Sequence, residues 1–243
     1  MSYFESRLKL NFNDLNDIKK KFIMCEKLGI KNLILEPKNN IINIPLELKN
    51  EIRKLTKINL FFRINLKPDN LKNFKKIIKN FNNFKEILSV ESEKKDVQIY
   101  AATDSRIDII SFSDQNIIKT ITPGVLSLIK QNNKLIEFSL APIMVDNKEI
   151  QSKNLRSLYR FLRVAKHSKV NYIINGNFED IFDFRNPRSL ISICYSLLEI
   201  PLNEAKNAFY KNITTLLEKI NRKYNHDLIE PDVKLILGEK DDA

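Results

Sequence analysis

The feature that most constrains the fold of this chain is a regular alternation of short β-rich runs with longer helical patterns. Runs of branched apolar residues recur about seven times, and a stretch with the helical spacing of apolar residues follows each of them. Compact connections between such units imply parallel strands joined by right-handed crossovers. Strands are expected at 3–10, 33–35, 60–64, 87–90, 108–111, 135–140 and 172–174, and the last two helices at 187–198 and 203–224.

A closed barrel and an open doubly wound sheet would both satisfy this alternation. The number of repeats and the length of the chain favour the barrel. The chain has only 4 glycines and no glycine-rich turn after its first strand, which counts against a dinucleotide-binding fold. We therefore predict an α/β protein, a TIM-like (β/α) barrel of about seven to eight parallel strands with outer helices. We expect one domain over residues 1–224 and a partly disordered, acidic C-terminal tail over 225–243.

The composition restricts the partners and the compartment. The formal net charge of +11 favours a polyanionic partner, although lysine and asparagine enrichment through compositional drift explains it equally well. Cys25 and Cys194 lie in expected helices and are not in a paired motif, so we expect reduced core residues. The N-terminus has no apolar signal region, and no apolar run reaches the roughly 20 residues that a membrane helix needs. We expect a soluble, cytoplasmic protein.

One expected helix, at about 150–166, carries a basic stripe. Lys153, Arg156, Arg160, Arg163 and His167 recur at spacings of three and four, so they share one face of the helix. Arginine suits phosphate because its planar guanidinium can bind two oxygens at once. The stripe indicates an RNA contact, and the alternative is an ordinary solvated face.

The segment Arg185-Asn186-Pro187-Arg188 predicts a second contact. Asn186 is a suitable N-cap, and Pro187 suits the first position of a helix. We expect free backbone N–H groups beside Arg185 and Arg188, which together would bind a phosphate or a partner. The alternative is simply a well-formed helix start.

Candidate catalytic residues are few. Glu36, Glu91 and Asp114 follow expected strands at the barrel face where active sites gather, and a Mg²⁺ site made of these carboxylates would make the chain a stand-alone metal-dependent hydrolase. The alternative is that they are ordinary loop and helix-start charges. The two histidines, His167 and His226, lie at no strand end and lack metal-ligand spacing. We therefore expect no catalytic and no metal-binding residue in this chain.

Several charged residues fall inside expected strands. Arg7, Arg63 and Glu137 are such residues, and buried charges are costly unless they are paired. We expect them to form an ion network inside the barrel. Arg106 and Asp108 are expected to form a similar arrangement.

Three segments, in order, resemble motifs of the archaeal ribonuclease P protein component 3 family, the counterpart of the thirty-kilodalton subunit of eukaryotic ribonuclease P. They are Arg106-Ile-Asp-Ile-Ile-Ser-Phe112, Ile136-Glu-Phe-Ser-Leu-Ala-Pro142 and Phe184-Arg-Asn-Pro-Arg-Ser-Leu190. The chain departs from the family pattern at Asn175-Gly176-Asn177-Phe178, where small residues are usual, and at Ser189, where an acidic residue is usual. The resemblance runs from about residue 3 to residue 224.

This resemblance implies a TIM-like barrel that is a non-catalytic subunit of a ribonucleoprotein, which removes the 5′ leader from precursor tRNA. It implies that the partner RNA holds the catalytic Mg²⁺ and that the protein binds no cofactor. The implied partners are ribonuclease P RNA, protein component 2 and, through the holoenzyme, precursor tRNA. Together with the basic patterns it makes these residues the candidates for RNA or partner binding: Arg106, Lys153, Arg156, Arg160, Arg163, Arg185 and Arg188. A protein scaffold whose basic surface meets an acidic protein is a third possibility.

Overall fold

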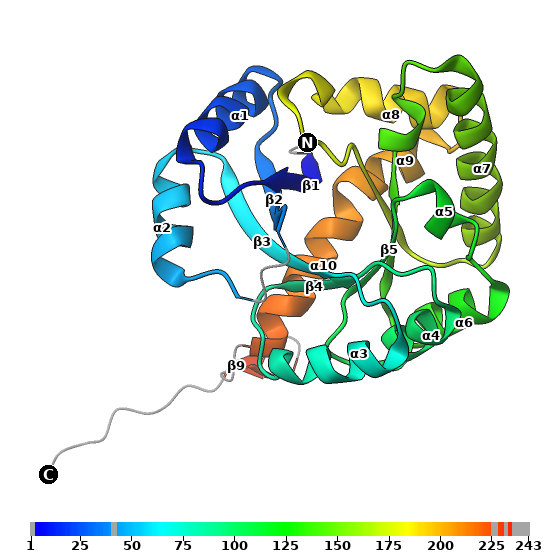
Figure 1. Cartoon of the computed structure of the whole chain (residues 1–243), viewed down its shortest axis with the longest axis horizontal. Helices are drawn as coiled ribbons and strands as arrows, with labels where there is room; N and C mark the ends of the chain where they lie inside the picture. Colours follow the sequence, from blue (N-terminus) through cyan, green and yellow to red (C-terminus); the bar gives the residue numbers. More distant parts are fainter. Residues whose placement is uncertain (1–2, 40–42, 225–227, 231–232, 235–243) are drawn as a thin grey trace, which may run out of the picture.

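The computed structural model describes residues 3–39, 43–224, 228–230 and 233–234. In this part of the chain a 7-stranded parallel sheet, with its strands in sequence order, curls into a barrel (Figure 1). The strands are β1 (Phe4–Leu10), β2 (Asn32–Pro37), β3 (Asn59–Leu66), β4 (Ile87–Val90), β5 (Ile109–Phe112), β6 (Leu135–Ser139) and β7 (Tyr172–Asn175). Each strand pairs in parallel with the next one along the chain, which confirms the predicted TIM-like barrel.

The barrel closes between β1 and the segment that follows β7. Leu8 forms an isolated parallel bridge with Phe178, and the backbone N–H of Lys9 donates to the Phe178 carbonyl at 3.0 Å. Gly176 lies under the ring of Phe178, where a Cβ atom would come within 2.2 Å of the ring. Seven strands therefore close the barrel, and this bridge and its backbone hydrogen bond join β1 to the segment that follows β7.

Helices surround the barrel in the order expected of repeated βα units. They are α1 (Leu15–Lys27), α2 (Leu46–Lys54), α3 (Leu71–Ile77), α4 (Lys95–Thr103), α5 (Gln115–Ile118), α6 (Pro123–Gln131), α7 (Lys148–His167), α8 (Pro187–Ser196) and α9 (Leu202–Phe209), with short 3₁₀ turns η1 (Ile78–Phe81), η2 (Ala141–Ile143) and η3 (Ile181–Asp183). Side chains of Asp14, Asn70, Thr122 and Asn147 accept backbone N–H groups at helix starts, which sets where the helices begin.

The single helix predicted over 203–224 is wrong. The chain forms α9 and then α10 (Lys211–Tyr224), separated at Tyr210, whose φ of −141° and ψ of −75° lie outside the helical region. The break lets α10 cross one opening of the barrel (Figure 1), where Ile213, Leu216 and Ile220 pack against strand residues such as Ile34. An apolar plug thus fills the end of the barrel at which the strands begin.

The main hydrophobic core lies between the strands and the outer helices. Cys25 and Cys194 are both buried and free, as predicted.

Leu228–Glu230 (β8) pairs antiparallel with Val233–Lys234 (β9), while His226 and most of the predicted acidic tail lie outside the described residues. No helix in the described part of the chain combines the length and the apolar character needed to span a bilayer.

Candidate functional site

The interior of the barrel is polar at the end where the strands finish, and Arg7 lies at its centre. Its side chain is fully buried. Its Nε lies 2.8 Å from Glu36, its Nη2 lies 2.8 Å from Glu91, and its Nη1 lies 3.7 Å from Glu137. The same Nη1 donates to the Ser111 hydroxyl at 3.1 Å. One guanidinium on β1 therefore contacts side chains of β2, β5 and β6 and the residue that follows β4.

A second buried guanidinium completes this network. Arg63 binds both oxygens of Glu137, at 2.6 and 2.9 Å, and its Nε lies 3.2 Å from Glu36. Its Nη2 also donates to the Ser89 hydroxyl at 2.8 Å. The predicted network of Arg7, Arg63 and Glu137 is confirmed.

The network includes two of the three carboxylates that the hydrolase alternative requires. Burial opposes ionisation of Glu36 and Glu91, but the charge and hydrogen bonds of Arg7 hold the pKa of both carboxyls below the usual glutamate range. The third, Asp114, caps α5 by accepting the Asn116 backbone N–H at 2.7 Å. No group of three or more His, Cys, Asp or Glu side chains within the described residues is arranged to hold a metal ion. A guanidinium lies where a metal would need ligands, which argues against this alternative.

Glu5 is a further buried carboxyl, located at the seam of the barrel. Its Oε2 accepts the Gly176 backbone N–H at 3.1 Å, and its Oε1 accepts the Arg7 backbone N–H at 3.1 Å. Burial raises the pKa of Glu5 to about 8, although these backbone donors, with that of Asn177, act in the opposite direction. Glu5 thereby ties β1 to the segment that follows β7.

We expect Glu5→Gln to flatten the pH dependence of stability near neutrality. A carboxyl whose pKa rises from 4.5 to about 8 on folding binds more protons in the folded state, so its contribution to stability falls as the pH rises through that interval. The free energy of unfolding of the wild type, measured by urea titration at several pH values, should fall across the interval more steeply than that of the variant. Parallel curves would show that Glu5 is ionised throughout.

The structure places the predicted basic stripe of α7 on the surface. The helix buries Asn154, Leu158, Leu162 and Ala165. Its basic side chains on the opposite face are all exposed: Lys153, Arg156, Arg160, Arg163 and His167. Ile150 was expected on the apolar side, but it is 50% exposed because it lies in the first turn of the helix.

Two of these arginines rest on neighbouring aromatic rings. The Arg163 guanidinium carbon lies 5.6 Å from the centre of the Tyr159 ring, and that of Arg160 lies 5.6 Å from the centre of the Phe161 ring. The Tyr159 hydroxyl is itself fixed, because it donates to Glu199 at 2.6 Å. Such stacking restrains a guanidinium while leaving its N–H groups directed outward. Two of the five basic side chains of the stripe are therefore restrained by aromatic rings.

The start of α8 differs from the expected phosphate site. Asn186 accepts the Arg188 backbone N–H on its Oδ1 at 2.9 Å, and its carbonyl accepts the N–H groups of Ser189 and Leu190 at 2.9 and 3.2 Å. The prediction of free backbone donors is wrong, because the cap and the first turn use these N–H groups. What the turn presents is the exposed side chain of Arg188.

The other arginine of this turn, Arg185, is partly used within the chain. Its Nη1 donates to the carbonyls of Phe182 and Phe184, at 2.6 and 2.9 Å. The side chain remains exposed overall, beside the 83% exposed ring of Phe182.

Arg106 occupies a structural position. Its Nε and Nη2 bind Asp104 at 2.9 and 2.6 Å, and its Nη1 donates to the Ile78 carbonyl at 3.1 Å and to Asn82 at 2.9 Å. Arg106 thus forms its ion pair with Asp104, while the Asp108 carboxylate accepts the Leu88 backbone N–H at 3.0 Å. Among the candidate RNA-binding residues, Arg106 has its guanidinium most fully bound within the protein.

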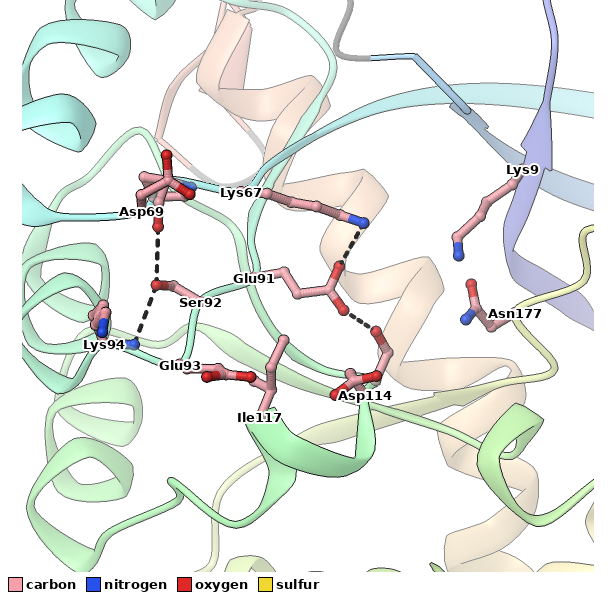
Figure 2. A pocket seen from close by; sticks show the side chains of 12 residues that line it. Lys9, Lys67, Asp69, Glu91, Ser92, Glu93, Lys94, Asp114, Ile117 and Asn177 are labelled. Atoms are coloured by element: carbon pink, nitrogen blue, oxygen red, sulfur yellow. Dashed lines mark hydrogen bonds and ion pairs between the residues drawn. The ribbon is translucent and has the colours of Figure 1, made fainter.

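A pocket that sequence reasoning missed opens above the ion network. Its volume is about 470 Å³, and it lies at the ends of the strands (Figure 2). Lys9, Lys67 and Asn177 line one side of it, and Asp69, Glu93 and Lys94 the other. The sequence did contain a signal for this pocket. Alternate residues along a strand face the same side, so Lys9 faces the same side as Arg7, and Lys67 the same side as Arg63.

Comparison with solved structures shows how widely this fold is used. The chain is similar to a chain in a cryo-EM structure of archaeal ribonuclease P with mature tRNA, with 15% identity, a TM-score of 0.79, and coverage of 97% of this chain and 99% of the other. It is also similar to A. niger ochratoxinase, with 9% identity, a TM-score of 0.60, and coverage of 89% of this chain and 71% of the other. A Xaa-Pro dipeptidase is similar too, with 9% identity, a TM-score of 0.62, and coverage of 90% of this chain and 76% of the other. At these identities the likenesses establish the fold alone.

The sequence comparisons are more specific. Curated proteins give no match to this chain. The profile of the family described as RNase P subunit p30, in contrast, matches residues 4–225. That span includes the barrel, the ion network and the basic face of α7. The chain therefore belongs to the RNase P subunit p30 family.

Proposed function

We propose that this chain is a protein subunit of ribonuclease P, which supports RNA-catalysed removal of the 5′ leader from precursor tRNA. The observation that carries the proposal is the family match over residues 4–225. The similar chain in archaeal ribonuclease P, matched over nearly the full length of both chains, supports it. The partners in this proposal are the catalytic RNA, protein component 2 and, through the holoenzyme, precursor tRNA.

The exposed basic face of α7 is the proposed RNA-binding surface. It presents Arg156, Arg160 and Arg163 in a row, and the net charge of +11 attracts a polyanion over longer distances. Arg188 at the start of α8 adds a further exposed guanidinium. In this proposal these residues contact phosphates and orient the RNA, and they carry no chemistry.

The chemistry, in this proposal, belongs to the RNA. The catalytic Mg²⁺ ions are held by the partner RNA, and the protein binds no cofactor. Two arginines at the centre of the barrel support this division, because they already bind the carboxylates of Glu36, Glu91 and Glu137, which a divalent cation would need as ligands at the position where barrel enzymes react. The role of the protein is then to stabilise the folded RNA at low Mg²⁺.

The decisive experiment is reconstitution of precursor-tRNA cleavage at limiting Mg²⁺. The cognate RNA and protein component 2 are assayed with and without this chain, and the rate of 5′-leader removal is measured. We expect the chain to raise the rate only when the RNA is present. No effect on a competent RNA and partner would refute the proposal, and cleavage by the protein alone would favour the hydrolase. Binding to protein component 2 with no RNA footprint of its own would favour a scaffold.

A further inference from the structure

The mouth of the barrel carries a second feature, separate from α7 and not used by the proposed function. Beside the pocket of about 470 Å³ lies a smaller one of about 190 Å³, and both are lined by Lys9 and Lys67. These two lysines therefore lie between the two pockets. The larger pocket falls within the range of roughly 300–1,000 Å³ that is usual for small-molecule sites.

The two lysines are only loosely paired. The Nζ atom of Lys9 lies 3.7 Å from Glu179, and that of Lys67 lies 3.5 Å from Glu91, both beyond the usual N–H···O hydrogen-bond length of about 2.7–3.2 Å. Glu179 also lies nearer to Lys38, at 3.1 Å. The Lys9 side chain is only 20% exposed, and the nearest carboxylate oxygen of Glu179 lies 3.7 Å from its ammonium.

Asn177 adds an amide to this end of the pocket. Figure 2 shows its side chain and the Lys9 ammonium directed toward each other and toward the open space. Its Oδ1, which can only accept a hydrogen bond, is buried without a partner in the described structure, so the group that Asn177 can offer to an anion is its amide Nδ2. Asn177 has a φ of +51°, and the segment that carries it is held by the Glu5 carboxyl through Gly176.

The carboxylates of the pocket are distributed unevenly. Glu91 is bound by Arg7 at 2.8 Å, and Asp114 caps the start of α5. Asp69 and Glu93 lie on the far side of the pocket, where Lys94 also lies (Figure 2). The carboxylates nearest to Lys9 and Lys67 are Glu179 and Glu91, at 3.7 and 3.5 Å, and each has a closer cation, Lys38 at 3.1 Å and Arg7 at 2.8 Å. The end formed by Lys9, Lys67 and Asn177 is therefore cationic. Burial and the charge of Arg7 also lower the pKa of Lys9, which an anion would reverse.

We propose that this end of the barrel mouth binds a phosphate group, held between Lys9, Lys67 and Asn177. Two ammonium groups and an amide can donate to several oxygens of one phosphate. The remaining volume accommodates the rest of a phosphate monoester, either a free nucleotide or the 5′-terminal nucleotide of an RNA. The site does not require α7 and goes beyond the proposed subunit role.

Binding of inorganic phosphate and AMP to the full chain, followed by NMR chemical-shift titration, tests this site. We expect saturable binding of both, and at least about a tenfold loss of affinity in Lys9→Gln and in Lys67→Gln. The matched control is Lys20→Gln, an exposed outer residue of α1 with the same change of charge, which should bind like the wild type. Equal weakening in the control, or full binding in both pocket variants, would refute the proposal.

Asn177→Asp gives a test that preserves shape. Aspartate tolerates the left-handed backbone that Asn177 adopts, so the fold should persist, which a thermal unfolding curve checks. Its added negative charge should abolish phosphate binding, while Asn177→Gly, which loses one donor but adds no charge, should weaken binding less than either lysine variant does. Binding by a folded Asn177→Asp protein would overturn the assignment.

Comparing oligoribonucleotides with and without a 5′-phosphate shows whether the site binds a free nucleotide or the 5′ end of an RNA. Tighter binding of the 5′-phosphorylated form, lost in Lys9→Gln, identifies an RNA end as the ligand. Binding of AMP but equal binding of both oligonucleotides identifies a free nucleotide. Reconstituted cleavage by Lys9→Gln separates this site from the subunit role, because loss of phosphate binding with unchanged cleavage leaves that role intact.

Discussion

Replacing Arg7 with methionine should destabilise the protein by about 3–5 kcal/mol, the usual cost of removing one partner from a buried ion network. The side chain of Arg7 is fully buried, and it binds Glu36 and Glu91 at 2.8 Å each. Methionine fills much of the same volume but leaves two buried carboxylates without their main cation. Urea denaturation near pH 7 measures the loss, and Arg222→Met, at an exposed position on α10, is the control.

The pH dependence of the same variant should reverse in sign. In the wild type Arg7 holds the pKa of Glu36 and Glu91 below their ordinary value of 4.5, so their contribution to stability is present above that pH and is lost as the pH falls. Without Arg7, burial dominates and raises the pKa of both carboxyls. Protonation of these carboxyls at low pH should therefore reduce the destabilisation of the variant. The difference in unfolding free energy between wild type and variant should therefore shrink as the pH is lowered toward 4.

A rescue experiment shows whether the cost comes from stranded charge. Adding Glu36→Gln and Glu91→Gln to Arg7→Met removes the unpaired carboxylates and should recover part of the lost stability, giving a coupling energy of roughly 0.5–3 kcal/mol. A single Arg7→Met variant as stable as the Arg222→Met control would contradict the prediction. Failure of the triple variant to recover would assign the loss to packing instead.

Much of this architecture could be predicted from local patterns. The alternation of β and α segments gave the parallel barrel, because each segment carries its own apolar period. The charges within strands were also informative, since Arg63 and Glu137 had to pair once they were assigned to buried positions. Even so, the sequence did not show that Glu36 and Glu91 bind the same guanidinium. That depends on closure of the barrel, which brings side chains from distant strands to one point.

The features that could not be predicted depend on tertiary contacts. No glycine or proline marks the break at Tyr210, and α10 turns there because Ile213 and Ile220 pack into the barrel opening. The donors at the start of α8 were expected to be free, but the Asn186 side chain and carbonyl accept them. The pocket at Lys9 was missed for a similar reason, because its walls come from β1, from α5 and from the segments that follow β3, β4, β5 and β7.

The basic face of α7 should account for the largest loss of RNA affinity. Replacing Arg156, Arg160 and Arg163 together with glutamine should weaken binding to ribonuclease P RNA by about 100-fold, if each contact contributes about 1 kcal/mol. Glutamine keeps helix propensity close to that of arginine, and all three positions are exposed, so the fold should be retained. Filter binding at several salt concentrations gives both the affinity and its salt dependence.

The salt dependence distinguishes a binding face from a general loss of charge. Each lost phosphate contact should reduce the slope of log K against log salt by roughly 0.7–0.9 units, so the triple variant should lose about 2–3 units. The matched control replaces Lys19, Lys20 and Lys27, three exposed lysines of α1, with glutamine and changes the net charge equally. If both triple variants lose the same affinity and slope, RNA responds only to net charge and α7 is not a specific surface. If the α7 variant alone loses them, the arginine row contacts RNA directly.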